Sequence, residues 1–152
     1  MDIRVLCVFG GSSAALMISQ YRLRRRVQFY ETDTAGVVHF SCYFRYMEEA
    51  EHALWREAGL SIHPPLGDIV WPRIAASFDF QRPLRFEQEF DILIRIAEIT
   101  PRTIRYSSIL SDGDTIFATG SITIACAQKA DGRMKAVDIP PEILSRFEVS
   151  RG

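Results

Sequence analysis

One long amphipathic segment is followed by strand patterns almost to the end of the chain. Apolar residues recur at helical spacing and predict a helix with Ser41 as its N-cap and Gly59 as its C-terminal stop. The apolar stripe of this helix consists of Tyr43, Met47, Ala50, Leu54 and Ala58. A helix of this length must bury its stripe against another layer, and strands are the elements that remain to form one.

Alternating apolar residues predict one strand before the helix and four strands after it. The first strand has one apolar face, which Arg25 interrupts. That face consists of Tyr21, Leu23, Val27 and Phe29. The later strands are expected at 73–81, 89–99, 103–111 and 115–128, with a hairpin turn at 111–114 and a helical turn after Pro140. This order favours an α+β fold, in which a curved antiparallel sheet of five to six strands wraps around one long central helix.

The composition is that of one globular domain, with 152 residues of which 47% are hydrophobic. A formal net charge of −1 gives no general affinity for nucleic acid or for an anionic membrane. The three cysteines form neither a CxxC pair nor a disulfide framework. Such a pattern fits a reducing compartment, and we therefore expect a cytoplasmic protein.

The first residues differ in character from the rest of the chain. We expect an extension of unknown role at 1–20, the folded domain at 21–145 and a tail at 146–152. Glycines and serines at 10–13 make the apolar N-terminal run too short for a membrane span, which needs about 20 apolar residues. A phosphate-binding turn at 10–13, a signal peptide and a natural start at Met17 are further interpretations of this region.

Between the first strand and the helix the chain reads FYETDTAGVVHFSCY, residues 29–43. A plain connection needs only Gly36, yet this one also carries an acid, Asp33, and a histidine, His39. The carboxylate could stabilise its own turn, as aspartates commonly do, or it could act as a chemical reagent. Local sequence leaves both interpretations open.

The segment from Asp33 to Phe40 has the pattern D-x-A-G-x-V-x-F. This pattern, at the end of a first strand and the start of a helix, resembles the 4-hydroxybenzoyl-CoA thioesterase branch of the hotdog-fold superfamily. The resemblance extends over residues 21–143 and includes the helix acid Glu48 and the segment QRPLRF at 81–86. In many of those relatives a histidine stands seven positions after the aspartate, where this chain has Phe40, so no role is transferred to His39.

The resemblance implies hydrolysis of an acyl-CoA thioester. Asp33 would act as nucleophile, through an acyl-enzyme anhydride, or as general base on water. The backbone N–H of Phe40 at the helix N-terminus would bind the developing oxyanion, and Gly36 would let the loop backbone approach the ligand. No metal or redox cofactor is expected, because coenzyme A is part of the substrate and its thiol leaves easily.

Further residues have two interpretations each. His39 could orient water or substrate, or pack at the helix start, and Glu48 could orient a loop or water, or face solvent. Tyr43 belongs to an aromatic run that could line an acyl pocket between subunits. By resemblance Arg102 lies near a CoA-phosphate position, with Arg105 close by on a strand, although both could be ordinary surface arginines.

Several other functions fit parts of the sequence. The main alternative is a non-catalytic module that binds acyl-CoA or acyl carrier protein, and a hotdog dehydratase would require His39 to pair with an acid. Cys42 with His39 suggests a cysteine hydrolase, while His39, Cys42, His52 and His63 lack the spacing of a known metal site. Apolar residues on both faces of the strand at 92–97 predict a homodimer or homotetramer.

Overall fold

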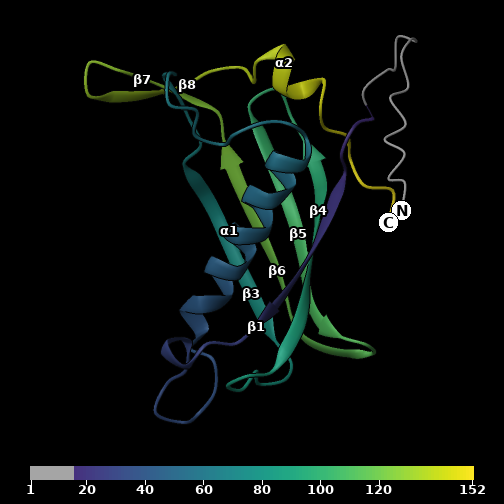
Figure 1. Ribbon diagram of the computed structural model, residues 1–152. Coiled ribbons are helices and arrows are strands. Elements are labelled where there is room, and N and C mark those ends of the chain that lie inside the picture. The colour runs from purple at the N-terminus through teal and green to yellow at the C-terminus, as the bar shows by residue number, and fades with distance from the viewer. Residues whose placement is uncertain (1–15) are drawn as a thin grey trace, which may run out of the picture.

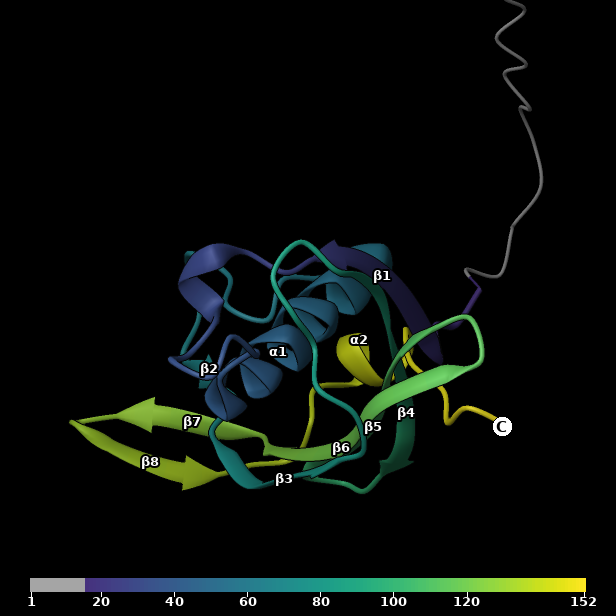
Figure 2. The same cartoon turned by 90° about the horizontal axis from the view of Figure 1, so that it is seen from below.

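The structure, a computed structural model, describes residues 16–152. Helix α1 lies across the concave face of a five-stranded sheet (Figure 1), and the sheet curls around it, as Figure 2 shows. Strands lie in the order β1-β4-β5-β6-β3, and every neighbouring pair is antiparallel. The bounds are β1 Gln20–Arg26, α1 Phe40–Glu57, β3 Arg73–Phe80, β4 Glu89–Ile99, β5 Thr103–Asp112 and β6 Thr115–Ala125. The predicted α+β architecture is confirmed.

Smaller elements complete the fold. They are the 3-10 turn η1 Phe29–Glu31, β2 Ile69–Val70, β7 Ala127–Ala130, β8 Arg133–Ala136 and α2 Pro141–Leu144. The short helix after Pro140 is as predicted, but the single strand expected at 115–128 is two strands that meet at Cys126. The Cys126 N–H donates to the carbonyl of Arg102, and the chain then leaves the main sheet for a projecting hairpin (Figure 1).

The core lies between α1 and the inner face of the sheet. Phe90, Ile92, Ile94 and Ile96 of β4 are fully buried. Their alternation with residues of the opposite face follows from the two-residue repeat of a strand. Leu93 on that opposite face is also buried, so apolar residues are buried on both faces, as the sequence predicted. Each such side chain contributes about 1.5–3 kcal/mol when it leaves water.

The first strand ends earlier than the alternation predicts. Phe29 begins η1 and is exposed, so its predicted place on the buried face is wrong. The cause is local, because the Gln28 N–H donates to the Glu31 carboxylate and turns the chain out of the sheet. Arg25 keeps its predicted place on the inner face, opposite Phe90 of β4.

Helix α1 begins at Phe40, and its N-cap lies two residues before the predicted one. His39, rather than Ser41, is the N-cap, with extended backbone and a ring Nδ1 that accepts a hydrogen bond from the Ser41 N–H. The helix ends as predicted, because Gly59 adopts a φ of 75° in the left-handed region that favours glycine.

Both ends of the described chain pack against the domain. Ile18 forms a β-bridge with Phe147, and the Phe147 ring is buried with its centroid 5.1 Å from that of Trp55. Ile18 and Phe147, which lie outside the predicted limits at 21 and 145, therefore pack with the folded domain. The interpretations for residues 1–15 lie outside the described residues. Across residues 16–152, none of the helices has the length and apolar character needed to cross a membrane.

One carboxylate is buried on the sheet-facing side of α1. Glu51 is 1% exposed, and its Oε2 accepts a hydrogen bond from Arg73 at 2.5 Å. Its Oε1 has no hydrogen-bond partner among residues 16–152. Burial raises the pKa of Glu51 to about 7, against the opposing attraction of Arg73. The folded protein therefore holds a proton that the unfolded chain releases at lower pH.

This proton makes stability depend on pH. Because the pKa of Glu51 is raised on folding, its contribution is complete below the ordinary value of 4.5 and is lost as pH rises through about 7. Between about pH 5 and pH 8 the free energy of unfolding of the wild type should fall by about 2–3 kcal/mol more than that of Glu51→Gln. Urea unfolding at both pH values measures it, with exposed Glu57→Gln on the same helix as control. An equal change in the free energy of unfolding between the two pH values for wild type and Glu51→Gln would contradict the prediction.

Candidate active site

A short hairpin carries Asp33 to the start of α1. At its base the His39 N–H donates to the Glu31 carbonyl at 2.8 Å, and nearer the tip the Asp33 N–H donates to the Val37 carbonyl at 2.9 Å. Between them Thr32 and Val38 form a β-bridge. Since His39 is the N-cap of α1, this ladder sets where the aspartate lies relative to the helix N-terminus.

Asp33 is exposed and has one oxygen engaged in its own turn. Oδ1 accepts a hydrogen bond from the Ala35 N–H at 2.8 Å, which is the Asx-turn that the sequence left open. Oδ2 accepts no hydrogen bond from residues 16–152. Gly36 closes the turn with a φ of 77°, while a Cβ added there would meet nothing within 4 Å. Backbone conformation is therefore sufficient to explain this glycine.

The N-terminus of α1 presents a free donor next to this turn. His39 uses its ring to accept from the Ser41 N–H and its carbonyl to accept from the Cys42 N–H. The Phe40 N–H donates to no acceptor within the described part of the chain. Helix N-terminal N–H groups carry partial positive charge, so this donor suits an oxyanion.

One cavity of about 380 Å³ brings these groups together. It is lined by Asp33, Val37, Val38, Phe40, Tyr43, Phe80, Gln81, Arg82 and Pro83. The predicted residues Asp33, Phe40 and Tyr43 therefore share one site. An apolar, half-open hollow with one carboxylate and one free backbone donor can bind a carbonyl compound and bring it close to the acid.

The aromatic wall of this cavity comes from two elements. Tyr43 on α1 packs edge-on against Phe80 at the end of β3, with ring centroids 4.9 Å apart. Burial raises the pKa of the Tyr43 hydroxyl. Behind them Phe78 lies over Gly120 of β6, where an added Cβ would come within 2.4 Å of its ring. The sequence analysis missed Phe80, although Phe78 and Phe80 at strand spacing before QRPLRF were the available signal.

Comparison with known proteins decides the family. Residues 27–147 match the model of the thioesterase-like superfamily. The chain belongs to this superfamily. The predictions of the hotdog fold and of a thioester hydrolase are confirmed at this level.

Individual relatives agree with the family. A 1,4-dihydroxy-2-naphthoyl-CoA hydrolase of Synechococcus sp. (strain CC9311) is 33% identical over 133 residues, or 80% of this chain and 86% of that protein. A hypothetical protein from Aquifex aeolicus is 30% identical with a TM-score of 0.75, over 84% of this chain and 99% of that chain. A 1,4-dihydroxy-2-naphthoyl-CoA thioesterase from Synechocystis, at 20% identity and a TM-score of 0.77 over 84% and 95% of the two chains, shows the fold alone.

Glu48 of this thioesterase lies outside the Asp33 cavity. It is two helical turns beyond Phe40, about 12 Å along the axis. Its carboxylate is half exposed and accepts from Arg73 at 3.3 Å. Of the two interpretations that the sequence allowed, this position favours a carboxylate at the surface. His39 serves as the helix cap and is exposed, and it does not line the cavity.

Arg102 and Arg105 lie toward the other end of the sheet. Phe80 of β3 and Leu110 of β5 both pair with Ala118 of β6, so they lie at the same position along the sheet. Arg102 immediately precedes β5, so about 25 Å of strand separates it from that level. It pairs with Asp138 at 2.9 Å, and Arg105 pairs with Glu98. Neither arginine lines the Asp33 cavity.

The geometry supports neither a cysteine hydrolase at Cys42 nor a metal site among the described residues. Cys42 is half-buried and donates to the Glu31 carbonyl, and burial followed by the charge of Glu31 raises the pKa of its thiol. A thiol with a raised pKa is a poor nucleophile. Among the described residues no group of three or more histidines, cysteines and acids is placed to hold a metal ion.

The arginines on the outer face of β1 are matched by acids. Arg22 and Arg24 both pair with Asp91, and Arg26 pairs with Glu89. These half-exposed pairs are of the kind worth about 0–1 kcal/mol each. The face is therefore a solvated strand surface and not a free ridge for anions.

Proposed function

We propose that this thioesterase hydrolyses acyl-CoA thioesters, with Asp33 as nucleophile or general base. The proposal depends on one observation: Asp33 and Phe40 line the same cavity, and the Phe40 N–H has no hydrogen-bond acceptor among residues 16–152. Thioester hydrolysis needs an activated oxygen and a donor for the developing oxyanion, and little help for the leaving group. These two groups supply both requirements.

Asp33 has a free oxygen for either role. As general base, Oδ2 takes a proton from water while the water oxygen bonds to the thioester carbon. As nucleophile, the carboxylate itself forms that bond, and water then cleaves the resulting anhydride. In both cases the carbonyl oxygen gains negative charge next to the Phe40 N–H, and the C–S bond breaks as the charge returns. The thiolate leaves readily because thiol pKa values lie near 8.5.

An aromatic acyl group is favoured by the walls of the cavity. Phe40 and Phe80 are 63% and 51% exposed, and both line the cavity with Tyr43. Large exposed aromatic side chains beside a reactive group indicate a ligand surface, and ring pairs gain about 0.5–1.5 kcal/mol beyond simple burial. The naphthoyl-CoA relative acts on an acyl group of this kind by its name.

A non-catalytic acyl-CoA binding module remains the second candidate. The Asx-turn bond from Ala35 to Asp33 favours it, since a turn role alone would explain the aspartate. The cavity beside Asp33 favours catalysis, because a residue with a structural role only needs no such hollow. Substitution of Asp33 separates these two candidates.

The enzyme is also proposed to be a homo-oligomer, at least a dimer. Strand β3 is an edge of the sheet and exposes Ile74 and Phe80. Unpaired edges with apolar side chains readily bind another strand.

Asp33→Asn tests the chemistry directly. The amide oxygen can still accept from the Ala35 N–H, so the turn is kept while the charge and basicity are lost. We expect kcat to fall by about 100-fold or more. Release of free CoA thiol is followed with benzoyl-, acetyl-, hexanoyl- and palmitoyl-CoA, with exposed Asp68→Asn as control. Equal rates for Asp33→Asn and wild type would reject Asp33 as the reagent, and binding without turnover would support the binding module.

Phe80→Ala tests the aromatic preference. We expect kcat/KM for benzoyl-CoA to fall about 10-fold, because the edge-on partner of Tyr43 is lost, while acetyl-CoA changes less than about twofold. Ile116→Ala is the control, since Ile116 is also half exposed but lines neither of the two hollows that include Asp33. An equal loss on both substrates would exclude a specific aryl contact.

Ile74→Lys tests the proposed association through the edge strand. A charge on β3 should disfavour pairing and shift the protein toward monomer, which sedimentation velocity measures. Arg133→Lys on the projecting hairpin keeps its charge and serves as control. A wild-type protein that sediments as a monomer at all concentrations would contradict the oligomer.

A further inference from the structure

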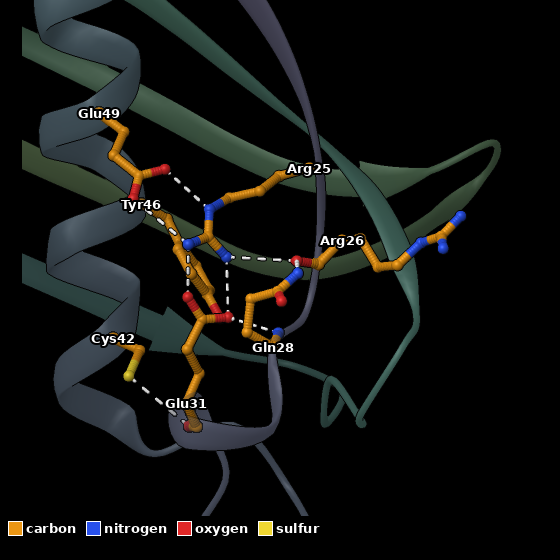
Figure 3. Close-up of polar contacts among 7 residues, drawn as sticks. All are labelled: Arg25, Arg26, Gln28, Glu31, Cys42, Tyr46 and Glu49. Atoms are coloured by element: carbon orange, nitrogen blue, oxygen red, sulfur yellow. Dashed lines mark hydrogen bonds and ion pairs between the residues drawn. The ribbon is translucent and has the colours of Figure 1, made fainter.

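An ion pair between the buried Glu31 and the partly buried Arg25 lies next to the start of the turn that carries Asp33. Arg25 extends inward from β1 and Glu31 extends upward from η1, and they meet beside the ring of Tyr46 on α1 (Figure 3). Glu31 is 5% exposed and Tyr46 is fully buried. The mechanism proposed above uses none of these three residues.

The Glu31 carboxylate is held from both sides. Arg25 donates to both oxygens, through Nη1 to Oε2 at 2.8 Å and through Nη2 to Oε1. Oε2 also accepts from the Gln28 N–H and from the Tyr46 hydroxyl, each at 2.8 Å. Strand β1 and helix α1 are thus joined through one carboxylate, whose hydrogen-bonding capacity is nearly filled.

Burial opposes the ionised state of Glu31, but hydrogen bonds from Arg25, Gln28 and Tyr46 outweigh it and lower the pKa of Glu31. The Arg25 guanidinium lies 4.5 Å from the centroid of the Tyr46 ring, and its Nε donates to Glu49 at 2.7 Å. Burying such charges costs several kcal/mol, so a buried ion pair is weak evidence for a role in stability. Its position suggests a role in geometry.

The backbone of Glu31 takes part in the active-site hairpin. Its carbonyl accepts from the His39 N–H, which is the base of the Asp33 hairpin. Asp33 lies two residues after Glu31, and Phe40 lies one residue after His39. Glu31 therefore connects two features of the fold. Its side chain binds Arg25 and Tyr46, and its backbone carbonyl closes the hairpin that separates Asp33 from Phe40.

We propose that Glu31, held by Arg25 and Tyr46, is a positioning residue that fixes the Asp33 carboxylate against the Phe40 N–H. This inference rests on the proposed thioesterase mechanism. A reacting group displaced by about 1 Å can lose about 100-fold in rate, so a freed turn lowers kcat while substrate binding remains. The carboxylate of Glu31 acts through the turn and does not touch the substrate.

Glu31→Gln is the principal test. The amide keeps the side-chain volume and an oxygen for Tyr46 and Gln28, but it loses the paired bonds with Arg25. We expect kcat for benzoyl-CoA to fall about 10- to 100-fold with KM changed less than about threefold, measured on protein shown to be folded. Glu89→Gln is the matched control and should retain wild-type kcat. It breaks a surface ion pair with Arg26, which neighbours Arg25 on β1.

Tyr46→Phe is a milder second variant. It removes only the hydroxyl on the helix side and leaves the ring beneath Arg25, so folding is preserved. We expect a loss in kcat of about 3- to 10-fold, smaller than that of Glu31→Gln. A loss of activity in either variant that only follows its folded fraction would show a structural role and overturn the inference.

Hydrogen exchange of the amides at 32–39 gives a readout that is independent of activity. The inference predicts exchange at least about 10-fold faster in Glu31→Gln at these amides, with unchanged exchange in β4 and β5. Unchanged exchange at 32–39 together with wild-type kcat would overturn it. If wild type hydrolyses no thioester, or Asp33→Asn keeps full rate, the proposed function fails, while the exchange result still decides whether Glu31 holds the turn.

Discussion

The hydrogen bond from the His39 N–H to the Glu31 carbonyl is the contact on which the geometry of the site depends. It closes the Asp33 hairpin and at the same time fixes the first residue before α1. A helix N-terminus is a useful oxyanion donor only when it is held at a defined distance from the reacting acid. In this fold that distance is set by backbone pairing over a few residues, and the curved sheet serves to hold α1 in place.

Two buried carboxylates, those of Glu31 and Glu51, lie beside different parts of α1. Near the N-terminus Arg25 and Glu31 satisfy one another and also bind Tyr46, so the ionised carboxylate is favoured. About one and a half helical turns beyond Tyr46, Glu51 accepts from Arg73 through one oxygen, and its other oxygen has no hydrogen-bond partner among residues 16–152. The pKa of Glu31 is lowered and that of Glu51 is raised, although both are buried. Hydrogen bonds to the charged form, more than burial itself, decide the direction.

Sequence predicted the features that are local or periodic. The alternation of β4 was predicted from its apolar residues, and Asp33 and Phe40 share a site because they lie seven positions apart in the sequence, across a short hairpin. His39 replaced Ser41 as the cap, although serine is the better cap by preference, because the Glu31 carbonyl already fixes the His39 backbone. Phe147 gave no periodic signal, since its partner Trp55 is distant in the chain. The separation of Arg102 from Asp33 depends on strand order, which spacing along one sequence does not contain.

The same reasoning explains why local sequence could not decide the role of Asp33. An Asx-turn and a general base use the same carboxylate, and here one oxygen makes the turn bond while the other has no donor among residues 16–152. Turn and reagent are therefore compatible uses of one residue. The turn bond restricts the orientation of the side chain, and Asp33 lines the cavity. What distinguishes a reagent from a turn residue is the environment of its second oxygen: an apolar cavity, an aromatic wall and an unpaired helix donor. Those come from β3 and α1, and they meet Asp33 only after the chain has folded.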